Sequence, residues 1–233
     1  MTAGSETLPD DSGKQLPIFR RLTERYPELN SCINDIVAAG TMLVNAARNN
    51  GKILICGNGG SAADADHITG ELLKSFCKKR PVEKELAEKL RGLDRINRNG
   101  TVGGENAGAL LAEKLQAGIP AICLTYHNAL STAYSNDVDP NLVFAQQCQV
   151  LGNAGDVFWG ISTSGNAKNV YYAALTAKAK GLTVLGLTGQ TGGRLKDCCD
   201  ICIRVPRAET YEVQELHLPV YHALCLFVED CFW

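Results

Sequence analysis

A histidine and a glutamate four residues apart, His67 and Glu71, follow a glycine-rich turn in the stretch KILICGNGGSAADADHITGELLKSF, residues 52–76. On a helix, this spacing places an imidazole and a carboxylate on one face, where both can reach one ligand and exchange protons with it. The alternative is an ordinary solvated pair on a helix surface. Small neighbours such as Ala63 and Gly70 favour the first interpretation, because they leave room for a ligand.

The elements that would position this pair can be predicted from the same stretch. Residues 52–56 form a short apolar, β-branched run that predicts a strand, and Asn58, Gly59 and Gly60 end it with a tight loop. Ser61 is suited to cap the helix that we expect over residues 62–76. Exposed backbone N–H groups and a helix N-terminus together attract anions.

A second loop repeats this pattern at residues 160–166, GISTSGN. An apolar strand ends, the hydroxyl residues Ser162, Thr163 and Ser164 follow, and a helix begins, an arrangement that suits a phosphate group. An ordinary capped turn between strand and helix would also use serine and threonine. Because two such loops follow strands of one predicted sheet, we favour phosphate binding. Neither loop is a nucleoside-triphosphate loop, since no GK[ST] follows.

Gln214 and His222 lie eight positions apart in QELHLPVYH and therefore fall near one face of a helix. With His67 and Glu71 they would supply a reasonable set of nitrogen and oxygen ligands for zinc. We expect this last long helix over residues 209–228, with a kink or local break at Pro219. His217 is interpreted as a core or interface histidine without a chemical role.

The rest of the chain alternates apolar runs with helical segments, which predicts an α/β fold with a five-stranded parallel sheet sandwiched between helices. Two helices divided near Pro27 should precede the sheet, within residues 16–50. The strands are expected at residues 52–56, 121–125, 157–161, 183–187 and 201–205, and an alanine-rich helix at residues 166–180. Ligands then belong at the carboxyl ends of the strands.

Three further boundaries follow. Residues 1–14 are expected to be disordered and residues 15–233 to form a single domain. Residues 77–118 break the alternation, and we interpret them as an inserted helical subregion, because so long a structureless loop is rare inside a compact domain. Its helical pieces are expected at residues 82–93 and 109–116.

Composition limits the function classes. The chain has 233 residues, 45% of them hydrophobic, and a formal net charge of −2, so nothing indicates a nucleic-acid or membrane-surface partner. The polar N-terminus does not resemble a signal peptide, and a cytoplasmic location is expected. The ten cysteines are therefore interpreted as reduced and mostly buried. Cys199 and Cys202 form a CxxC, but no second pair completes a zinc site.

With GNGGSAADADH followed by Glu71, then GISTSGNAKNV, then QELHLPVYH, the sequence resembles the sugar isomerase (SIS) domain family, and within it the phosphoheptose (sedoheptulose 7-phosphate) isomerases. The match covers residues 50–76 and 119–228. It implies a flavodoxin-like sheet order, assembly as a homotetramer with active sites shared between subunits, and a phosphosugar as the small-molecule partner.

The resemblance also implies roles for individual residues. Glu71 matches the family's general base and His222 its general acid, while His67, Glu71, Gln214 and His222 match its zinc ligands. Those that would hold the sugar or its phosphate are Asn58, Gly59, Gly60, Ser61, Asn136, Asp137, Ser162, Thr163, Ser164 and Gln214. A carboxylate and an imidazole on opposite sides of a sugar could exchange a ketose and an aldose through an enediol.

The chain departs from the family pattern at three places. Ala167 stands where the family often has another phosphate-binding serine, Tyr211-Glu212 precedes Gln214 in place of a small or acidic residue and an arginine, and residues 77–118 are inserted. These departures bear on the identity of the sugar more than on the type of reaction.

Two other function classes compete with an isomerase. The first is a dinucleotide enzyme, since residues 57–62 fit GxGxxA, but no second strand ending in an acidic residue follows about 20 residues later. The second is a non-catalytic SIS domain that binds a phosphosugar or serves regulation. Glu71 and His222 weigh against it, because a pure binding module needs no base and acid together.

Overall fold

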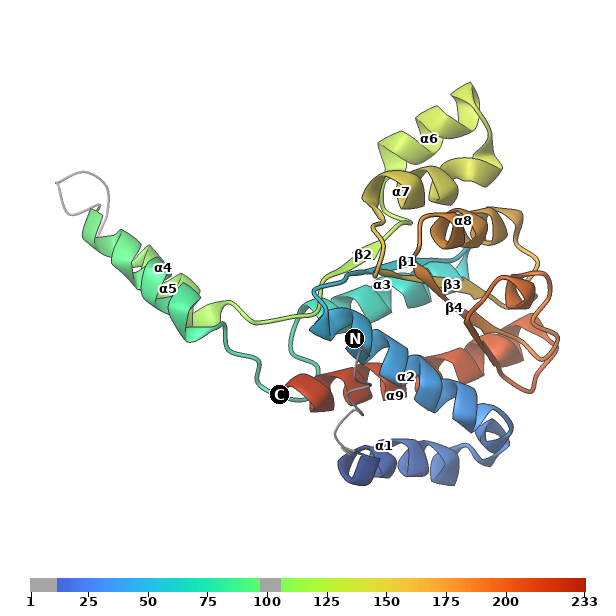
Figure 1. Ribbon diagram of the computed structural model, residues 1–233, viewed down its shortest axis with the longest axis horizontal. Coiled ribbons are helices and arrows are strands. Elements are labelled where there is room, and N and C mark those ends of the chain that lie inside the picture. The colour runs from blue at the N-terminus through green and yellow to red at the C-terminus, as the bar shows by residue number, and fades with distance from the viewer. Residues whose placement is uncertain (1–11, 97–105) are drawn as a thin grey trace, which may run out of the picture.

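A computed structural model describes residues 12–96 and 106–233 of the chain (Figure 1). Its centre is a parallel sheet with the strand order β2-β1-β3-β4-β5, which is the flavodoxin-like order. The strands are β1 (Ile53–Cys56), β2 (Ala121–Cys123), β3 (Val157–Ser162), β4 (Thr183–Thr188) and β5 (Ile201–Arg204). Each coincides with a predicted strand within two residues, so the predicted fold class is confirmed.

The strands are apolar throughout because helices cover both faces of the sheet. Every residue of β1 and β3 is buried, including the pair Ile55 and Trp159, which lie side by side in register. On one face pack the helices α1 (Ser12–Arg25), α2 (Ile33–Arg48), α3 (Gly60–Leu73) and α9 (Thr210–Phe232). On the other pack α7 (Val143–Leu151) and α8 (Lys168–Ala179). A run that must be buried on both sides cannot alternate with polar residues.

The N-terminal helices differ slightly from prediction. Helix α1 begins at Ser12, inside the stretch 1–14 that we expected to be disordered, and residues 1–11 lie outside the described part of the chain. A 3₁₀ turn, η1 (Pro27–Cys32), separates α1 from α2 as predicted. Two more such turns are η2 (Pro140–Leu142) and η3 (Leu195–Asp197).

Helix α9 runs without interruption past Pro219, so the expected local break does not occur. The proline is buried in the packed core, where tertiary contacts outweigh the lost helix hydrogen bond. Within the described residues, no helix is long and apolar enough to cross a membrane.

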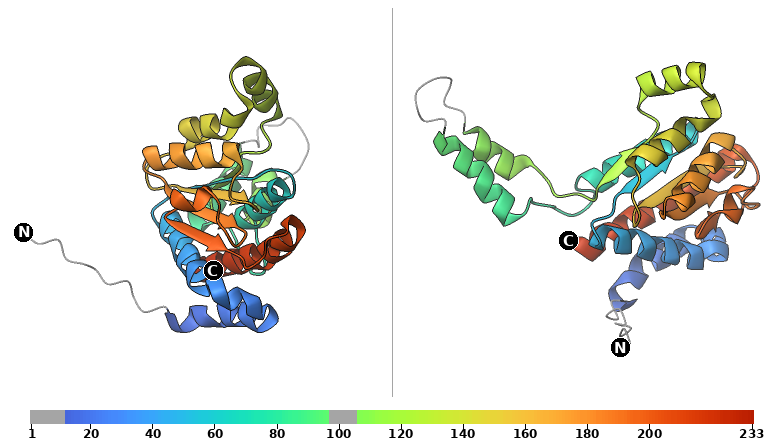
Figure 2. Two further views of the ribbon diagram at one scale, coloured as in Figure 1. Left: turned by 90° about the vertical axis from the view of Figure 1, so that its right-hand side faces the viewer. Right: turned by 45° about the horizontal axis from the view of Figure 1, so that its top comes forward.

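The inserted segment forms two antiparallel helices, α4 (Lys84–Ile96) and α5 (Ala107–Lys114), near the predicted positions. This hairpin projects away from the sheet and its covering helices, as Figure 1 and the right-hand view of Figure 2 show. Asp94 caps α5, accepting hydrogen bonds from the backbone N–H groups of Gly108 (2.7 Å) and Ala109 (2.8 Å). At the base, Pro81 and Gln116 form a β-bridge.

Candidate functional site

A cavity of about 340 Å³ opens where the loops after β1 and β3 meet. These two strands are neighbours at the point where the strand order reverses, the usual ligand position in such a sheet. The lining residues are Asn58, Gly59, Gly60, Ser61, Ile161, Ser162, Thr163, Ser164, Ala167, Thr210 and Gln214. The structure thus brings together both predicted loops and the start of α9.

Backbone geometry explains the glycines of the first loop. Gly59 has φ 55° and precedes the first residue of α3, so it occupies the cap position that we predicted for Ser61. Ser61 is instead buried inside the first turn of the helix, which is a correction to that prediction. At Gly60 a Cβ atom would lie 2.3 Å from Nε2 of Gln214, so any larger residue would displace the Gln214 amide from its position beside the loop.

A pair of asparagines joins the first loop to the first turn of α8. Nδ2 of Asn58 donates to Oδ1 of Asn169, and Nδ2 of Asn169 donates to Oδ1 of Asn58, both at 2.8 Å. Asn169 and Thr210 were not among the predicted site residues. The signal for Asn169 was its place in the first turn of the helix that follows the second loop.

The cavity suits an anion. Helices α3, α8 and α9 all begin beside it, and their N-terminal N–H groups carry partial positive charge. Ser164 also caps its own turn, since its Oγ accepts a hydrogen bond from the backbone N–H of Asn166 at 3.1 Å. Ser164 therefore has the turn-capping role that we considered as the alternative to phosphate binding. Ser162 and Thr163 line the cavity.

A second polar group lies between α3 and α9. Nε2 of His67 is 3.4 Å from Oε1 of Glu71, and the rings of His67 and His222 are 5.1 Å apart in an edge-to-face arrangement. Nδ1 of His67 is 3.0 Å from the hydroxyl of Tyr221. Nζ of Lys74 donates to Oε2 of Glu71 at 2.9 Å. The predicted base and acid therefore belong to one cluster.

Burial shifts the pKa of two groups at this cluster, His222 and Asp64. Burial, with the neighbouring His67, lowers the pKa of His222, although Glu71 acts in the opposite sense. Nε2 of His222 is buried without a hydrogen-bond partner. Burial also raises the pKa of Asp64 to about 6, opposed by a hydrogen bond from Tyr221 and by His67. Asp64, one turn before His67, was not predicted as a site residue.

Helices α3 and α9 run parallel, with Gly60 beside Gln214 and His67 beside Tyr221. The cavity and the polar cluster are therefore two turns apart on the same two helices, about 10 Å at 1.5 Å per residue. A chain-like ligand with an anionic end could reach from one to the other.

Comparison with known proteins decides the family. A family model described as SIS domain matches residues 19–102 and 105–189. The chain is 35% identical to the phosphoheptose isomerase of Rhodospirillum rubrum over 205 residues, covering 88% of this chain and 90% of that one. The chain belongs to the SIS domain family.

Solved structures of two phosphoheptose isomerases resemble the fold of this chain. The phosphoheptose isomerase of Neisseria gonorrhoeae superposes with a TM-score of 0.67 at 29% identity, covering 96% of this chain and all of the other. That of Francisella tularensis gives 0.69 at 28% identity, covering 95% and 97%.

This SIS domain does not place Asn136 and Asp137 in the loop cavity. Both are exposed at the end of α6 (Asn128–Asp137), outside the cavity lining, and Nδ2 of Asn136 donates to Oδ1 of Asp137 at 2.9 Å. Helix α6 stands beyond α7, away from the sheet (Figure 1). The expectation that they line the sugar pocket is therefore not met within one chain.

The four predicted zinc ligands are only partly assembled in the SIS domain. His67, Glu71 and His222 face one another, whereas the amide of Gln214 lies against Gly60 in the loop cavity. No group of three or more His, Cys, Asp or Glu side chains in residues 12–96 and 106–233 is arranged to hold a metal ion. The donor types nevertheless suit zinc, and Nε2 of His222 lacks a partner.

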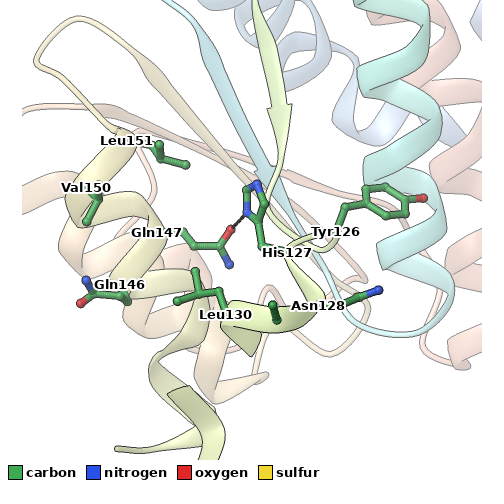
Figure 3. Close-up of a pocket in the computed structure, with 9 residues that line it drawn as sticks. Tyr126, His127, Asn128, Leu130, Gln146, Gln147, Val150 and Leu151 are labelled. Atoms are coloured by element: carbon green, nitrogen blue, oxygen red, sulfur yellow. Dashed lines mark hydrogen bonds between the residues drawn. The ribbon is translucent and has the colours of Figure 1, made fainter. Parts of the chain in front are cut away.

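A wider groove of about 710 Å³ lies elsewhere in the SIS domain, between α6 and α7 (Figure 3). It is lined by Tyr126, His127, Asn128, Ala129, Leu130, Gln146, Gln147, Val150 and Leu151. Nε2 of the buried Gln147 donates to the carbonyls of Leu124 (2.9 Å) and Val143 (3.3 Å), so its Oε1 must accept from Nδ1 of His127. The lining has no carboxylate to act with His127, so we do not assign the reaction to this groove.

Proposed function

We propose that the protein is an aldose-ketose isomerase for a phosphosugar, most directly the conversion of sedoheptulose 7-phosphate to a heptose 7-phosphate. The curated relatives and solved structures named phosphoheptose isomerase support this reaction class. The observation that carries the proposal is the position of Glu71 and His222 two to three turns beyond an anion-binding cavity on the same pair of helices.

Different residues would bind the phosphate and transfer the protons. Ser162, Thr163 and the helix N-termini would bind the phosphate and fix the position of the sugar carbons. Glu71 would remove a proton from the carbon beside the carbonyl and return it to the neighbouring carbon through the enediol. Burial lowers the pKa of His222, so it would act as a neutral imidazole. As the general acid it would give its N–H proton to the carbonyl oxygen and take up the proton of the neighbouring hydroxyl, which completes the exchange through the enediol.

Turnover of phosphorylated ketoses with five to seven carbons tests the proposal. The heptose phosphate should give the highest kcat/KM, whereas a different best substrate would correct the identity of the sugar. Glu71→Gln should abolish turnover and leave phosphosugar binding within about threefold, since the carboxylate is removed and the cavity is intact. Glu85→Gln, on the distant hairpin, is the matched control. Binding without turnover in the wild-type protein would favour the non-catalytic alternative.

We also propose a zinc ion held by His67, Glu71 and His222 and by Gln214, whose amide would have to turn from Gly60 toward the other three. When bound, zinc would stabilise negative charge that develops on a sugar oxygen. The donor types and the unpartnered Nε2 of His222 support it. Metal analysis of the purified protein, with thermal unfolding before and after chelation, tests it without relying on activity. A protein without metal whose unfolding ignores added zinc would overturn it.

For assembly we propose a homotetramer with shared active sites. Sharing would explain why Asn136 and Asp137 lie outside the cavity of their own chain. Light scattering measures the mass, and a monomer at micromolar concentration would contradict the proposal. We further propose the cytoplasm as its compartment, a location supported by the ten cysteines, all within the described residues, none of which forms a disulfide.

A further inference from the structure

The α4–α5 hairpin carries a row of exposed leucines. Leu86 and Leu93 on α4 are 46% and 52% exposed, and Leu111 on α5 and Leu115 directly after it are 42% and 45% exposed. The body of the chain does not cover them, since the hairpin stands apart from it (Figure 2).

These four leucines lie on one side of the hairpin. Ala87 on α4 and Ala112 on α5 are buried between the helices, and Gly108 packs on the backbone of Leu90. Each residue advances around an α-helix by about 100°, so Leu86 and Leu93 lie a quarter to a third of a turn around α4 from Ala87. Leu111 and Leu115 lie around α5 from Ala112 in the same rotational direction. Because the helices are antiparallel, equal offsets place all four on the same side.

The area of this leucine face fits a self-association surface. About half of each side chain remains exposed, so the face offers roughly 350 Å² of apolar surface, within the range of functional patches. Two such faces packed together would bury roughly 700 Å² from the leucines alone. With their flanking residues they approach the ~1,000 Å² that a specific interface needs.

The charges bordering the leucine face also permit contact between identical copies. Glu85 and Lys89 form an ion pair of 2.6 Å along α4, and Lys114, which borders the face on α5, forms one of 2.7 Å with Glu113 on the other side of that helix. Each border is therefore locally neutral. An identical face meets no net repulsion there, whereas a strongly acidic or basic partner would gain nothing from it.

We propose that the leucine face of the hairpin packs against the same face of a second copy of this chain, forming a four-helix interface. Such pairing about a twofold axis is self-complementary, because each copy presents the same surface to the other. The inference goes beyond the isomerase reaction and holds whether or not the protein is catalytic.

Photo-crosslinking of the full chain tests the interface. A photoreactive amino acid replaces Leu111, the protein is irradiated, and the linked peptides are identified by mass spectrometry. We expect a covalent dimer in which both peptides come from residues 82–116. Absence of a dimer would overturn the proposal, as would links from position 111 to the body of another copy or to a different protein.

A charged variant provides the second test. With the same probe, Leu86→Glu combined with Leu93→Glu should reduce the yield of crosslinked dimer at least tenfold, because four carboxylates would meet across the interface. Glu88→Lys, on the opposite side of α4, should leave the yield within twofold. Circular dichroism checks that both variants keep their helices. An unchanged yield in the double variant would refute the assignment of this face.

Discussion

Arg80 and Glu229 form a buried ion pair that fixes the far end of the candidate site. Nε of Arg80 is 2.8 Å from Oε1 of Glu229, and their side chains are only 1% and 2% exposed. The guanidinium also donates to the carbonyls of Leu72 (3.0 Å) and Glu71 (3.2 Å), the last turn of α3. Glu229 therefore holds, through Arg80, the helix turn that carries the proposed base.

The first prediction concerns this ion pair. Burial alone would raise the pKa of Glu229, but backbone N–H groups of Phe76 and Cys77 together with Arg80 lower it, so the carboxylate is charged when folded. Glu229→Gln leaves the Arg80 charge buried without its partner and should lower the free energy of unfolding by about 3–5 kcal/mol. Chemical denaturation measures this.

The matched control for that variant is Glu24→Gln, which removes the exposed ion pair with Arg20 and should cost less than about 1 kcal/mol. Equal losses in the two variants would show that burial of the Arg80–Glu229 pair does not matter.

The second prediction concerns pH. Burial lowers the pKa of His217 to about 4, and the backbone of Thr188, which favours the charged ring, offsets this only in part. In the unfolded chain this histidine titrates near 6.5, so below that pH the unfolded state binds a proton that the folded state excludes. Stability from this residue is complete above pH 6.5 and falls between pH 6.5 and 4, by about 3 kcal/mol.

Replacing His217 with phenylalanine should remove this pH dependence. Denaturation curves of wild type and variant between pH 7 and 4 give the difference, which cancels other groups such as Asp64, whose raised pKa acts in the opposite direction. Parallel curves for the two proteins would mean that His217 has the same pKa in the folded and unfolded states, so that burial does not lower it.

The third prediction concerns the glycines of α3. In Gly60→Ala the new Cβ meets the amide of Gln214 and must displace it, so kcat/KM of the isomerase should fall at least tenfold with a change in stability below about 1 kcal/mol. Gly70→Ala meets nothing within 4 Å in the same helix and should stabilise it by about 0.5–1 kcal/mol. Steady-state kinetics and denaturation of both variants are the measurements. Full activity of the first variant would show that Gln214 is not needed at the cavity.

The fourth prediction concerns the asparagine pair. Asn169→Ala removes both hydrogen bonds to Asn58 and should raise KM for the phosphosugar about tenfold, because the loop that binds it loses its cross-link. kcat should change less than KM, since the base and acid lie two turns away. Asn30→Ala, which removes an exposed hydrogen bond to the carbonyl of Pro27, is the control. A fall in kcat with an unchanged KM would assign Asn169 a different role.

Much of the fold could be predicted because local sequence patterns indicate its strands, helices and loops. A strand covered on both faces must be apolar throughout, so β1 and β3 can be recognised in the sequence as runs of apolar residues. Glycine and hydroxyl residues mark the loops where those runs end. Since parallel strands end at one edge of the sheet, the two loops could be placed together before any coordinates were known. The Gly59 cap was missed because its positive φ and the burial of Ser61 depend on the packing of α3.

The sheet, its loops and the types of reactive side chain follow from the amino-acid order, because strand and helix periodicity and turn chemistry are local properties. Which distant residues meet depends on how the helices pack, and it became known with the structure. Arg80 pairs with Glu229 across 149 positions, Gln214 lies at the loop cavity rather than with His67, and Asn136 and Asp137 lie outside the cavity of their own chain. The structure also shows that the insertion projects as a hairpin. These outcomes depend on how α3 and α9 align and on which surfaces the core leaves uncovered, and no local pattern encodes either.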